Sequence, residues 1–321
     1  MTTALPRRQA LALAATPWLG ACAAPPPQAA PVDAAARLQG PAVVLPGTLW
    51  QDLRDPASGD TWRITVLPPL LPPPPGGHAV LYVLDGQRSF ALAAQLARIT
   101  LDRPADVRGD VPIVVGLDLP TDTMDVPARR RRYTPPAEVQ ADAWHAASHP
   151  ANALLGFLAG LQARVAAQWP VHPARQTLFG HSITGLFAAY ALLARGGALF
   201  GRYAAGSPSL WQQGDAAYWQ RLAQHLLARQ PAPSHPAQAK VQVQLSVGEL
   251  EAAAHAPSAQ RAARLAERRP IDSVRHLATL LHSFAPQTMS VRLSVYPGLD
   301  HGAVMPRALL DAFELARQPA P

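Results

Sequence analysis

The chain is poor in cysteine, in lysine and in charge. Its 321 residues contain one cysteine, Cys22, so no disulfide can form within the chain. Lysine occurs only at Lys240, and charged residues make up 15% of the sequence. The basic residues, which give a net charge of +7, do not form runs interleaved with aromatic side chains, as they do in nucleic-acid-binding proteins. The composition therefore predicts no nucleic-acid partner, and its positive field favours anionic substrates or membrane surfaces.

The first part of the chain differs in composition from the rest. Two arginines precede an apolar stretch over residues 10–19, which is too short for a permanent membrane span. Cys22 ends the sequence LGAC, which resembles a bacterial lipobox, and residues 23–42 are rich in proline and alanine, as in an extended tether. We expect a lipoprotein-type signal peptide over residues 1–22 and an exported, periplasmic domain anchored to a membrane by a lipid on Cys22. The alternative is an ordinary signal peptide with a chance cysteine.

Residues 43–321 alternate between strand and helix patterns, and 49% hydrophobic residues suffice for one large core. Strands are expected within residues 61–70, 79–86, 111–120, 176–180, 240–251 and 289–302, and helices within residues 88–100, 153–169, 185–195, 273–284 and 305–318. Several of the strands are continuous apolar runs, which are typical of strands buried on both faces of a parallel sheet. We therefore predict one α/β domain with a mostly parallel central sheet and helices on both faces. Residues 212–240 are expected to form a helical excursion or cap.

Residues 178–187, LFGHSITGLF, place a serine between a short apolar strand and an alanine-rich helix. A strained turn in this position projects a serine hydroxyl above the sheet, and the following helix directs its first amides at a developing oxyanion. Ser182 is therefore the predicted nucleophile, with the amide of Ile183 as one oxyanion donor. The elbow pattern G-x-S-x-G has a glycine where this chain has Thr184. The substitution predicts that the helix and strand lie slightly apart, or that the threonine methyl fills space that a neighbour has vacated.

A nucleophilic serine needs a base and an acid. Of the eleven histidines, His301 lies on the loop after the last apolar strand, where the chain order serine, acid, histidine places the base. The acid is expected at the end of the strand between them, in SVGELE, where it would fix the tautomer of His301. Glu251 is the preferred acid and Glu249 the alternative. Asp300 is less suitable because adjacent residues on a loop rarely face each other.

The second oxyanion donor is expected after an early strand. The sequence YVLDG ends in Gly86, which lets the backbone approach the site closely. The amide of Gly86 or of Gln87 is therefore predicted to face Ser182. This chemistry needs no cofactor and no metal ion, and none is expected.

Five motifs occur in order along the chain: YVLDG, GHSITGLF, GSPSLW, SVGELE and PGLDHG. Together they resemble the Putative esterase family of α/β-hydrolases, which includes siderophore esterases, feruloyl esterases, formylglutathione hydrolases and mycolyltransferases. The set is most similar to the periplasmic esterases of enterobactin and salmochelin trilactones, and the resemblance covers roughly residues 45–315. It implies an α/β-hydrolase fold with Ser182 as nucleophile, His301 as base and an acid from SVGELE. Some members of this branch work with a serine and histidine alone.

The resemblance also implies that the stretch RRRRYTPP, residues 129–136, lines the substrate cleft. Arg132 is predicted to contact an anionic ligand such as a ferric catecholate, with Tyr133 beside it; the alternative is a solvated basic loop. Trp211 is expected either as an aromatic wall of the pocket or as a core residue. The predicted function is hydrolysis of a small-molecule carboxylic ester, such as a trilactone siderophore, through an acyl-enzyme. The alternatives are a deacylase or acyltransferase of envelope glycans and a catalytically inactive siderophore-binding lipoprotein.

Overall fold

The computed structural model describes residues 44–121, 123–137, 149–213, 216–229, 240–284 and 288–320. The predicted signal peptide, the lipidation site Cys22 and the tether lie outside the described residues. The compact unit that carries the sheet begins at Leu45. None of the helices in these ranges combines the length and the apolar character that a membrane crossing requires.

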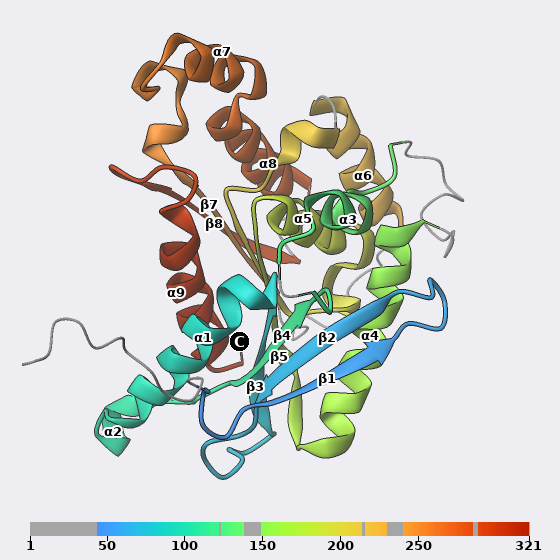
Figure 1. The fold of residues 1–321 in the computed structure, drawn as a ribbon, viewed down its shortest axis with the longest axis vertical. Coiled ribbons are helices and arrows are strands. Elements are labelled where there is room, and N and C mark those ends of the chain that lie inside the picture. Colours follow the sequence, from blue (N-terminus) through green and yellow to red (C-terminus); the bar gives the residue numbers. More distant parts are fainter. Residues whose placement is uncertain are drawn as a thin grey trace, which may run out of the picture. The chain divides into compact units, whose positions relative to one another are not determined.

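The described residues form one eight-stranded sheet, in the order β1-β2-β4-β3-β5-β6-β7-β8 (Figure 1). The strands are β1 (Leu49–Arg54), β2 (Thr61–Leu67), β3 (His78–Leu84), β4 (Ile113–Asp118), β5 (Val171–His181), β6 (Arg202–Gly206), β7 (Val241–Gly248) and β8 (Met289–Tyr296). The pairs β1 with β2 and β2 with β4 are antiparallel, and every pair from β4 to β8 is parallel. The prediction of a mostly parallel sheet is confirmed. Strands β1 and β6 were not predicted, because β1 is mostly exposed and β6 has only five residues.

Helices cover both faces of the sheet (Figure 1). They are α1 (Gly86–Leu101), α2 (Ala105–Arg108), α3 (Val126–Tyr133), α4 (Pro150–Gln168), α5 (Ile183–Arg195), α6 (Ala216–Arg229), α7 (Ala259–Arg268), α8 (Pro270–Phe284) and α9 (Val304–Arg317). Short 3-10 turns are η1 (Gly196–Ala198), η2 (Leu210–Gln213), η3 (Glu249–Glu251) and η4 (Ala253–His255). Helices α1 and α9 pack together on one face of the sheet, and α5 and α8 pack on the other.

Strand β3 shows how one sheet serves two cores. Val80, Tyr82 and Leu84 point into the core beneath α5, and the alternate residues Leu81 and Val83 point into the core beneath α1 and α9. Because side chains alternate between faces along a strand, a strand with helices on both sides must be apolar throughout. This is why β3 reads as a continuous apolar run.

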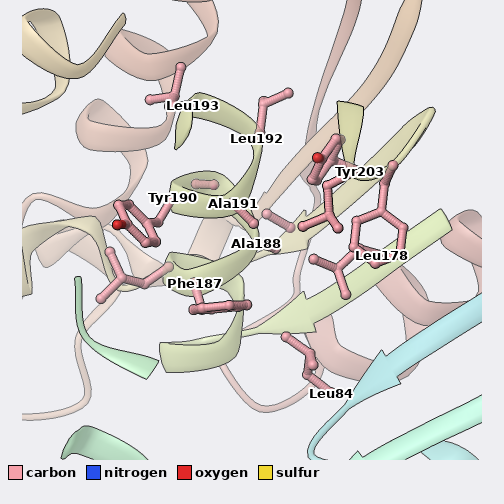
Figure 2. Packing of buried hydrophobic residues seen from close by; sticks show 14 of the residues in the cluster. Leu84, Leu178, Phe187, Ala188, Tyr190, Ala191, Leu192, Leu193 and Tyr203 are labelled. Atoms are coloured by element: carbon pink, nitrogen blue, oxygen red, sulfur yellow. The ribbon is translucent and has the colours of Figure 1, made fainter. Parts of the chain in front are cut away.

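Helix α5 is buried along almost its whole length, with the last residues at its C-terminus as the exception. Figure 2 shows Ala188 of this helix on the side of Leu178 of β5 and Tyr203 of β6, and Tyr190 on the opposite side; all four belong to one buried cluster. A helix that is apolar on all sides belongs in a core. The first turn of α5, which directly follows Ser182, is therefore held in place by packing along the rest of the helix.

Candidate active site

Ser182 lies in a strained turn between β5 and α5. Its backbone has φ 61° and ψ −116°, a conformation that costs a non-glycine residue on the order of 1–3 kcal/mol. Backbone hydrogen bonds hold the turn: Ser182 N donates to Gly206 O at 2.9 Å, and Ser209 N donates to Ser182 O at 3.0 Å. A Cβ on Gly180 would clash with the carbonyl of Thr184, so this flank must be glycine. The strain projects the Ser182 side chain away from the sheet, as a nucleophile elbow requires.

The close packing expected at the second flank of the elbow occurs one residue later. A Cβ on Gly185 would lie 3.0 Å from Gly206 O and 3.2 Å from Gly180 O, so the helix approaches the neighbouring strands at Gly185. Thr184 is completely buried and its hydroxyl is hydrogen-bonded to neighbouring residues. The structure therefore gives Thr184 a polar role that the prediction of a displaced helix or a space-filling methyl did not include.

A continuous chain of hydrogen bonds leads from Ser182 into the protein. His301 Nε2 lies 2.9 Å from Ser182 Oγ, and His301 Nδ1 lies 2.7 Å from Glu251 Oε2. The other carboxylate oxygen, Oε1, accepts bonds from Ser207 Oγ at 2.5 Å and from Gly248 N at 2.9 Å. With Nδ1 protonated and facing the carboxylate, Nε2 is free to accept the serine proton. The order is that of nucleophile, base and acid.

The structure brings Glu251, and not Glu249, to His301. Burial by itself would raise the pKa of the Glu251 carboxyl, but hydrogen bonds from His301 and Ser207 hold that pKa below its usual value. Glu251 is therefore ionised at neutral pH despite its burial. Glu249 is exposed and accepts a bond from Gly298 N at 2.8 Å instead.

A cavity of about 240 Å³ opens at Ser182. It is lined by Val126, Arg129, Arg130, Ser182, Ile183, Ser207, Pro208, Ser209, Trp211, Gln212, Glu251, Arg261, Leu265, Arg268, Pro270 and His301. Arg129 is paired with Asp85, whereas Arg130, Arg261 and Arg268 form no ion pair with any carboxylate in the described part of the chain. Among the described residues of the lining, Glu251 is the one acidic residue, and it already faces His301. The cavity wall is therefore cationic.

Trp211 lines this cavity. This is one of the two positions predicted for it, the other being the core. The guanidinium of Arg268 stacks over its indole ring at 4.0 Å from the ring centroid. The same two side chains also line a neighbouring cavity of about 420 Å³. The stacked pair thus forms part of the wall of both cavities.

Arg132 and Tyr133 were predicted to contact the substrate, but the structure does not bring them to the cavity. Neither lines the cavity: Arg132 Nη2 donates to Asp60 Oδ1 at 2.7 Å, and Tyr133 is completely buried. No helix was predicted here, but residues 129–133 belong to α3. Of this helix, Val126, Arg129 and Arg130 line the cavity, whereas Arg132 is held by Asp60 and Tyr133 packs in the core.

A signal for helix α3 was present in the sequence. Asp125 precedes a Val-Pro pair, and its side chain caps the helix by accepting a bond from Ala128 N at 2.8 Å. Aspartate at the N-cap followed by proline in the first turn is a helix-start pattern. This pattern would have predicted a helix over these residues.

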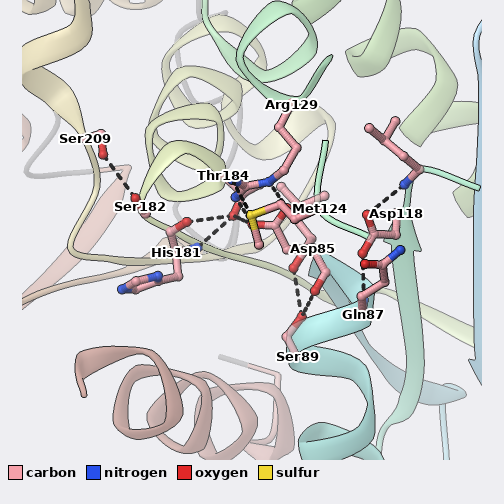
Figure 3. Close-up of polar contacts among 12 residues, drawn as sticks. Asp85, Gln87, Ser89, Asp118, Met124, Arg129, His181, Ser182, Thr184 and Ser209 are labelled. Atoms are coloured by element: carbon pink, nitrogen blue, oxygen red, sulfur yellow. Dashed lines mark hydrogen bonds and ion pairs between the residues drawn. The ribbon is translucent and has the colours of Figure 1, made fainter. Parts of the chain in front are cut away.

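The predicted oxyanion donors also need correction. The amide of Gln87 donates to Asp118 Oδ2 at 2.7 Å, and Figure 3 shows this pair on the far side of Asp85 from Ser182. Neither Gly86 nor Gln87 lines the Ser182 cavity; Gly86 instead lets α1 pack directly on the backbone of β4. Ile183 does line the cavity. Of the three predicted donors, the structure therefore brings only Ile183 to the site.

Two serines of the site were not predicted as functional residues. Ser207 donates to Glu251, and Ser209 Oγ lies 3.3 Å from Ser182 Oγ. Both belong to the quoted motif GSPSLW, which follows β6. His181 Nε2 lies 2.8 Å from the backbone oxygen of His301. Among the described residues, no group of three or more His, Cys, Asp or Glu side chains is arranged to hold a metal ion.

The burial of His181 predicts a dependence of stability on pH. Burial, and then the neighbouring His301, lower the pKa of His181 from 6.5 to about 4. An unfolded chain therefore takes up this proton at a higher pH than the folded protein. The stabilisation is fully present above about pH 6.5 and is lost as the pH falls toward 4, with a total on the order of 3 kcal/mol.

We expect His181→Gln, which retains a donor at the position of Nε2, to remove most of this acid sensitivity. The free energy of unfolding would be measured by urea titration of both proteins at about pH 7 and about pH 4.5. His78 and His149, whose pKa values are also lowered by burial, titrate in both proteins and cancel in the comparison. An equal loss of stability in the two proteins would contradict the assignment.

Comparison with known proteins agrees with this geometry. The Putative esterase family matches residues 59–287. Ferri-bacillibactin esterase BesA of Bacillus subtilis (strain 168) is 28% identical over 287 residues, which cover 87% of this chain and 92% of BesA. The structure of siderophore hydrolase EstB from Aspergillus nidulans is similar with a TM-score of 0.71 and 25% identity, over 88% of this chain and 100% of EstB.

The BES protein from Bacillus cereus has the same fold, with a TM-score of 0.69 and 21% identity over 88% of this chain and 100% of that chain. The family match spans most of the sheet and includes Ser182 and Glu251. The chain therefore belongs to the Putative esterase family, has the α/β-hydrolase fold and is a carboxylic ester hydrolase.

Proposed function

We propose that the protein hydrolyses the ester bonds of a siderophore through an acyl-enzyme on Ser182. The observation that carries the proposal is the hydrogen-bond chain from Ser182 through His301 to Glu251, at the wall of a cavity. A serine, a base and an orienting acid within hydrogen-bonding reach are the parts that nucleophilic catalysis needs. BesA is named as a ferri-bacillibactin esterase and EstB as a siderophore hydrolase, which supports the substrate class.

In the acylation step, Ser182 Oγ attacks the ester carbonyl carbon while its proton passes to His301 Nε2. The carbonyl oxygen becomes an oxyanion, which the amide of Ile183 at the start of α5 stabilises. Glu251 stabilises the positive charge on the imidazole. His301 then gives the proton to the leaving alkoxide, the ester C–O bond breaks, and the acyl group remains on Ser182.

In the deacylation step, water replaces the alcohol. His301 Nε2 takes a proton from the water as its oxygen attacks the acyl carbon. The bond to Ser182 Oγ then breaks, and His301 returns the proton to that oxygen. The products are the free acid and the original enzyme, so no external oxidant or reductant takes part.

The cavity wall supports an anionic substrate with aromatic groups. Arg130, Arg261 and Arg268 line the cavity, and so does Trp211, on whose ring the Arg268 guanidinium stacks. Guanidinium groups form strong charge-assisted bonds with oxygen anions, and they also stack on aromatic rings. The neighbouring cavity, which shares Trp211 and Arg268, adds room for a substrate larger than a single ester group. A trilactone siderophore of the catecholate type has these properties.

Product analysis tests the proposed substrate. The purified protein would be incubated with ferric and iron-free trilactone siderophores and, separately, with acylated saccharides, and the products followed by mass. We expect each opened lactone to gain one water. Release of acyl groups from the saccharides with intact lactones would instead favour a glycan deacylase.

The cationic wall predicts a difference between substrates of different charge. We expect Arg130→Gln and Arg261→Gln each to raise KM for an anionic ester by about tenfold, because each removes a charged hydrogen-bond donor. The value of kcat, and the kinetics with a neutral p-nitrophenyl ester, should change little. Steady-state kinetics with both esters would measure this.

Arg131→Gln is the matched control, because it removes one positive charge from α3, the helix that carries Arg130. Arg131 is paired with Asp60 and does not line the cavity. An equal rise in KM for this variant would mean that only the net charge of the protein matters.

A further inference from the structure

Thr184 makes contacts that the glycine of the elbow pattern cannot make. Its Oγ1 lies 2.9 Å from both His181 N and His181 O, and 3.1 Å from Asp85 Oδ2. The hydroxyl accepts the bond from His181 N and has one proton to donate. Because a carboxylate is a stronger acceptor than a peptide carbonyl, that proton is directed to Asp85.

Asp85 is itself held by an arginine of the cavity wall. Arg129 Nε donates to Asp85 Oδ1 at 2.7 Å, and Arg129 Nη2 donates to Oδ2, so the pair is bidentate (Figure 3). The two side chains are only 11% and 10% exposed, which limits their screening by solvent. Arg129 lies on α3 and lines the Ser182 cavity. Arg129 therefore links the cavity wall to Thr184.

Thr184 is also linked to His301, the base, through His181. Thr184 fixes the backbone of His181, and the imidazole of His181 bonds to the backbone oxygen of His301 at 2.8 Å. The two imidazole rings also lie close, with centroids 4.9 Å apart. The same hydroxyl thus contacts the residue before the nucleophile and, through it, the loop that carries the base.

We propose that Thr184 is a positioning residue that aligns Ser182 with His301, and that Arg129 acts on catalysis through Asp85 and Thr184. The hydroxyl restrains the strained peptide on the N-terminal side of Ser182. A substrate group that contacts Arg129 is therefore connected, through Asp85, to the hydrogen bonds of Thr184 that align Ser182 with His301. The inference rests on the proposed function, because it assumes that Ser182 and His301 perform the reaction.

Two substitutions separate the hydroxyl from the shape of the side chain. Thr184→Val keeps the shape and loses all three contacts, whereas Thr184→Ser keeps the hydroxyl and loses the methyl. We expect Thr184→Val to lower kcat about 10- to 100-fold with KM within about twofold, and Thr184→Ser to stay within about threefold of the wild-type kcat. The substrate is a p-nitrophenyl ester.

The measurement must not count unfolded protein. Active sites would be titrated with a fluorophosphonate probe, and kcat expressed per labelled site. Equal losses of kcat in Thr184→Val and Thr184→Ser, or a change confined to KM, would overturn the positioning role. A wild-type protein that neither reacts with the probe nor hydrolyses the ester would instead overturn the proposed function, and the two failures are therefore distinguishable.

A double-mutant cycle tests the part of Arg129. We expect Arg129→Gln to lower kcat about tenfold in the wild-type protein and less than twofold in Thr184→Val, since the connection is already broken there. The effect on KM, which reports direct contact with substrate, should be the same in both backgrounds. Additive effects on kcat would show that Arg129 acts independently of Thr184.

Discussion

Ser182→Ala is expected to lower ester hydrolysis by roughly 10⁴- to 10⁶-fold, the loss that follows removal of the nucleophile from a serine hydrolase. Alanine removes the Oγ that lies 2.9 Å from His301 Nε2 and leaves the backbone contacts of the turn in place. The protein should therefore fold normally. Hydrolysis of a p-nitrophenyl ester and of a trilactone siderophore, the proposed substrate, would measure the loss, with urea unfolding as the check on folding.

Ser290→Ala is the matched control for this loss. Ser290 is an exposed residue of β8 and lies outside the cavity that holds Ser182. Its removal should leave both activities unchanged. Hydrolysis by Ser182→Ala at more than about a tenth of the wild-type rate would mean that another group is the nucleophile, because the remaining groups of a serine hydrolase cannot supply that rate.

Glu251→Gln is expected to lower kcat by about 10³- to 10⁴-fold, although the change replaces one oxygen by one nitrogen. Ser207 Oγ and Gly248 N both donate to Oε1, so the glutamine oxygen will occupy that side. Its NH₂ group then faces His301 Nδ1 and requires that nitrogen to be an acceptor. The proton moves to Nε2, which can no longer take the proton of Ser182. Steady-state kinetics with a p-nitrophenyl ester would measure the loss.

Glu249→Gln is the matched control for the acid. Its carboxylate is exposed and contacts Gly298 N, and no step of the mechanism passes through it. We expect kcat within about threefold of wild type, as for a surface substitution away from the site. If Glu251→Gln and Glu249→Gln behaved alike, the enzyme would work with serine and histidine alone.

The sequence predicted the site residues best where a single strand or loop determines their position. Ser182, Glu251 and His301 follow β5, β7 and β8, and the C-terminal ends of parallel strands lie at the same edge of a sheet. Their order and their positions after strands were therefore enough to predict that they meet. The hydroxyl of Ser207 on Glu251 could not be predicted, because it depends on the path of the loop after β6.

The errors arose where a second segment decides what a group contacts. The amide of Gln87 follows β3, as predicted, but the carboxylate of Asp118 at the end of β4 accepts its hydrogen bond. Nothing in the sequence near Gln87 indicates this competition. In the arginine stretch, helix α3 was not predicted, and Arg129 and Arg130 of this helix line the cavity instead of Arg132.

The burial of α5 has a consequence for how the active site is lost. Amides in a helix that is packed on all sides exchange with solvent only when the whole domain opens, whereas exposed loops open locally. Ser182 precedes this helix directly, so we expect its strained conformation to persist as long as α5 stays packed. His301, on an exposed loop, does not share that protection to the same extent. Partial unfolding would therefore separate the base from the nucleophile before it released the strain at Ser182.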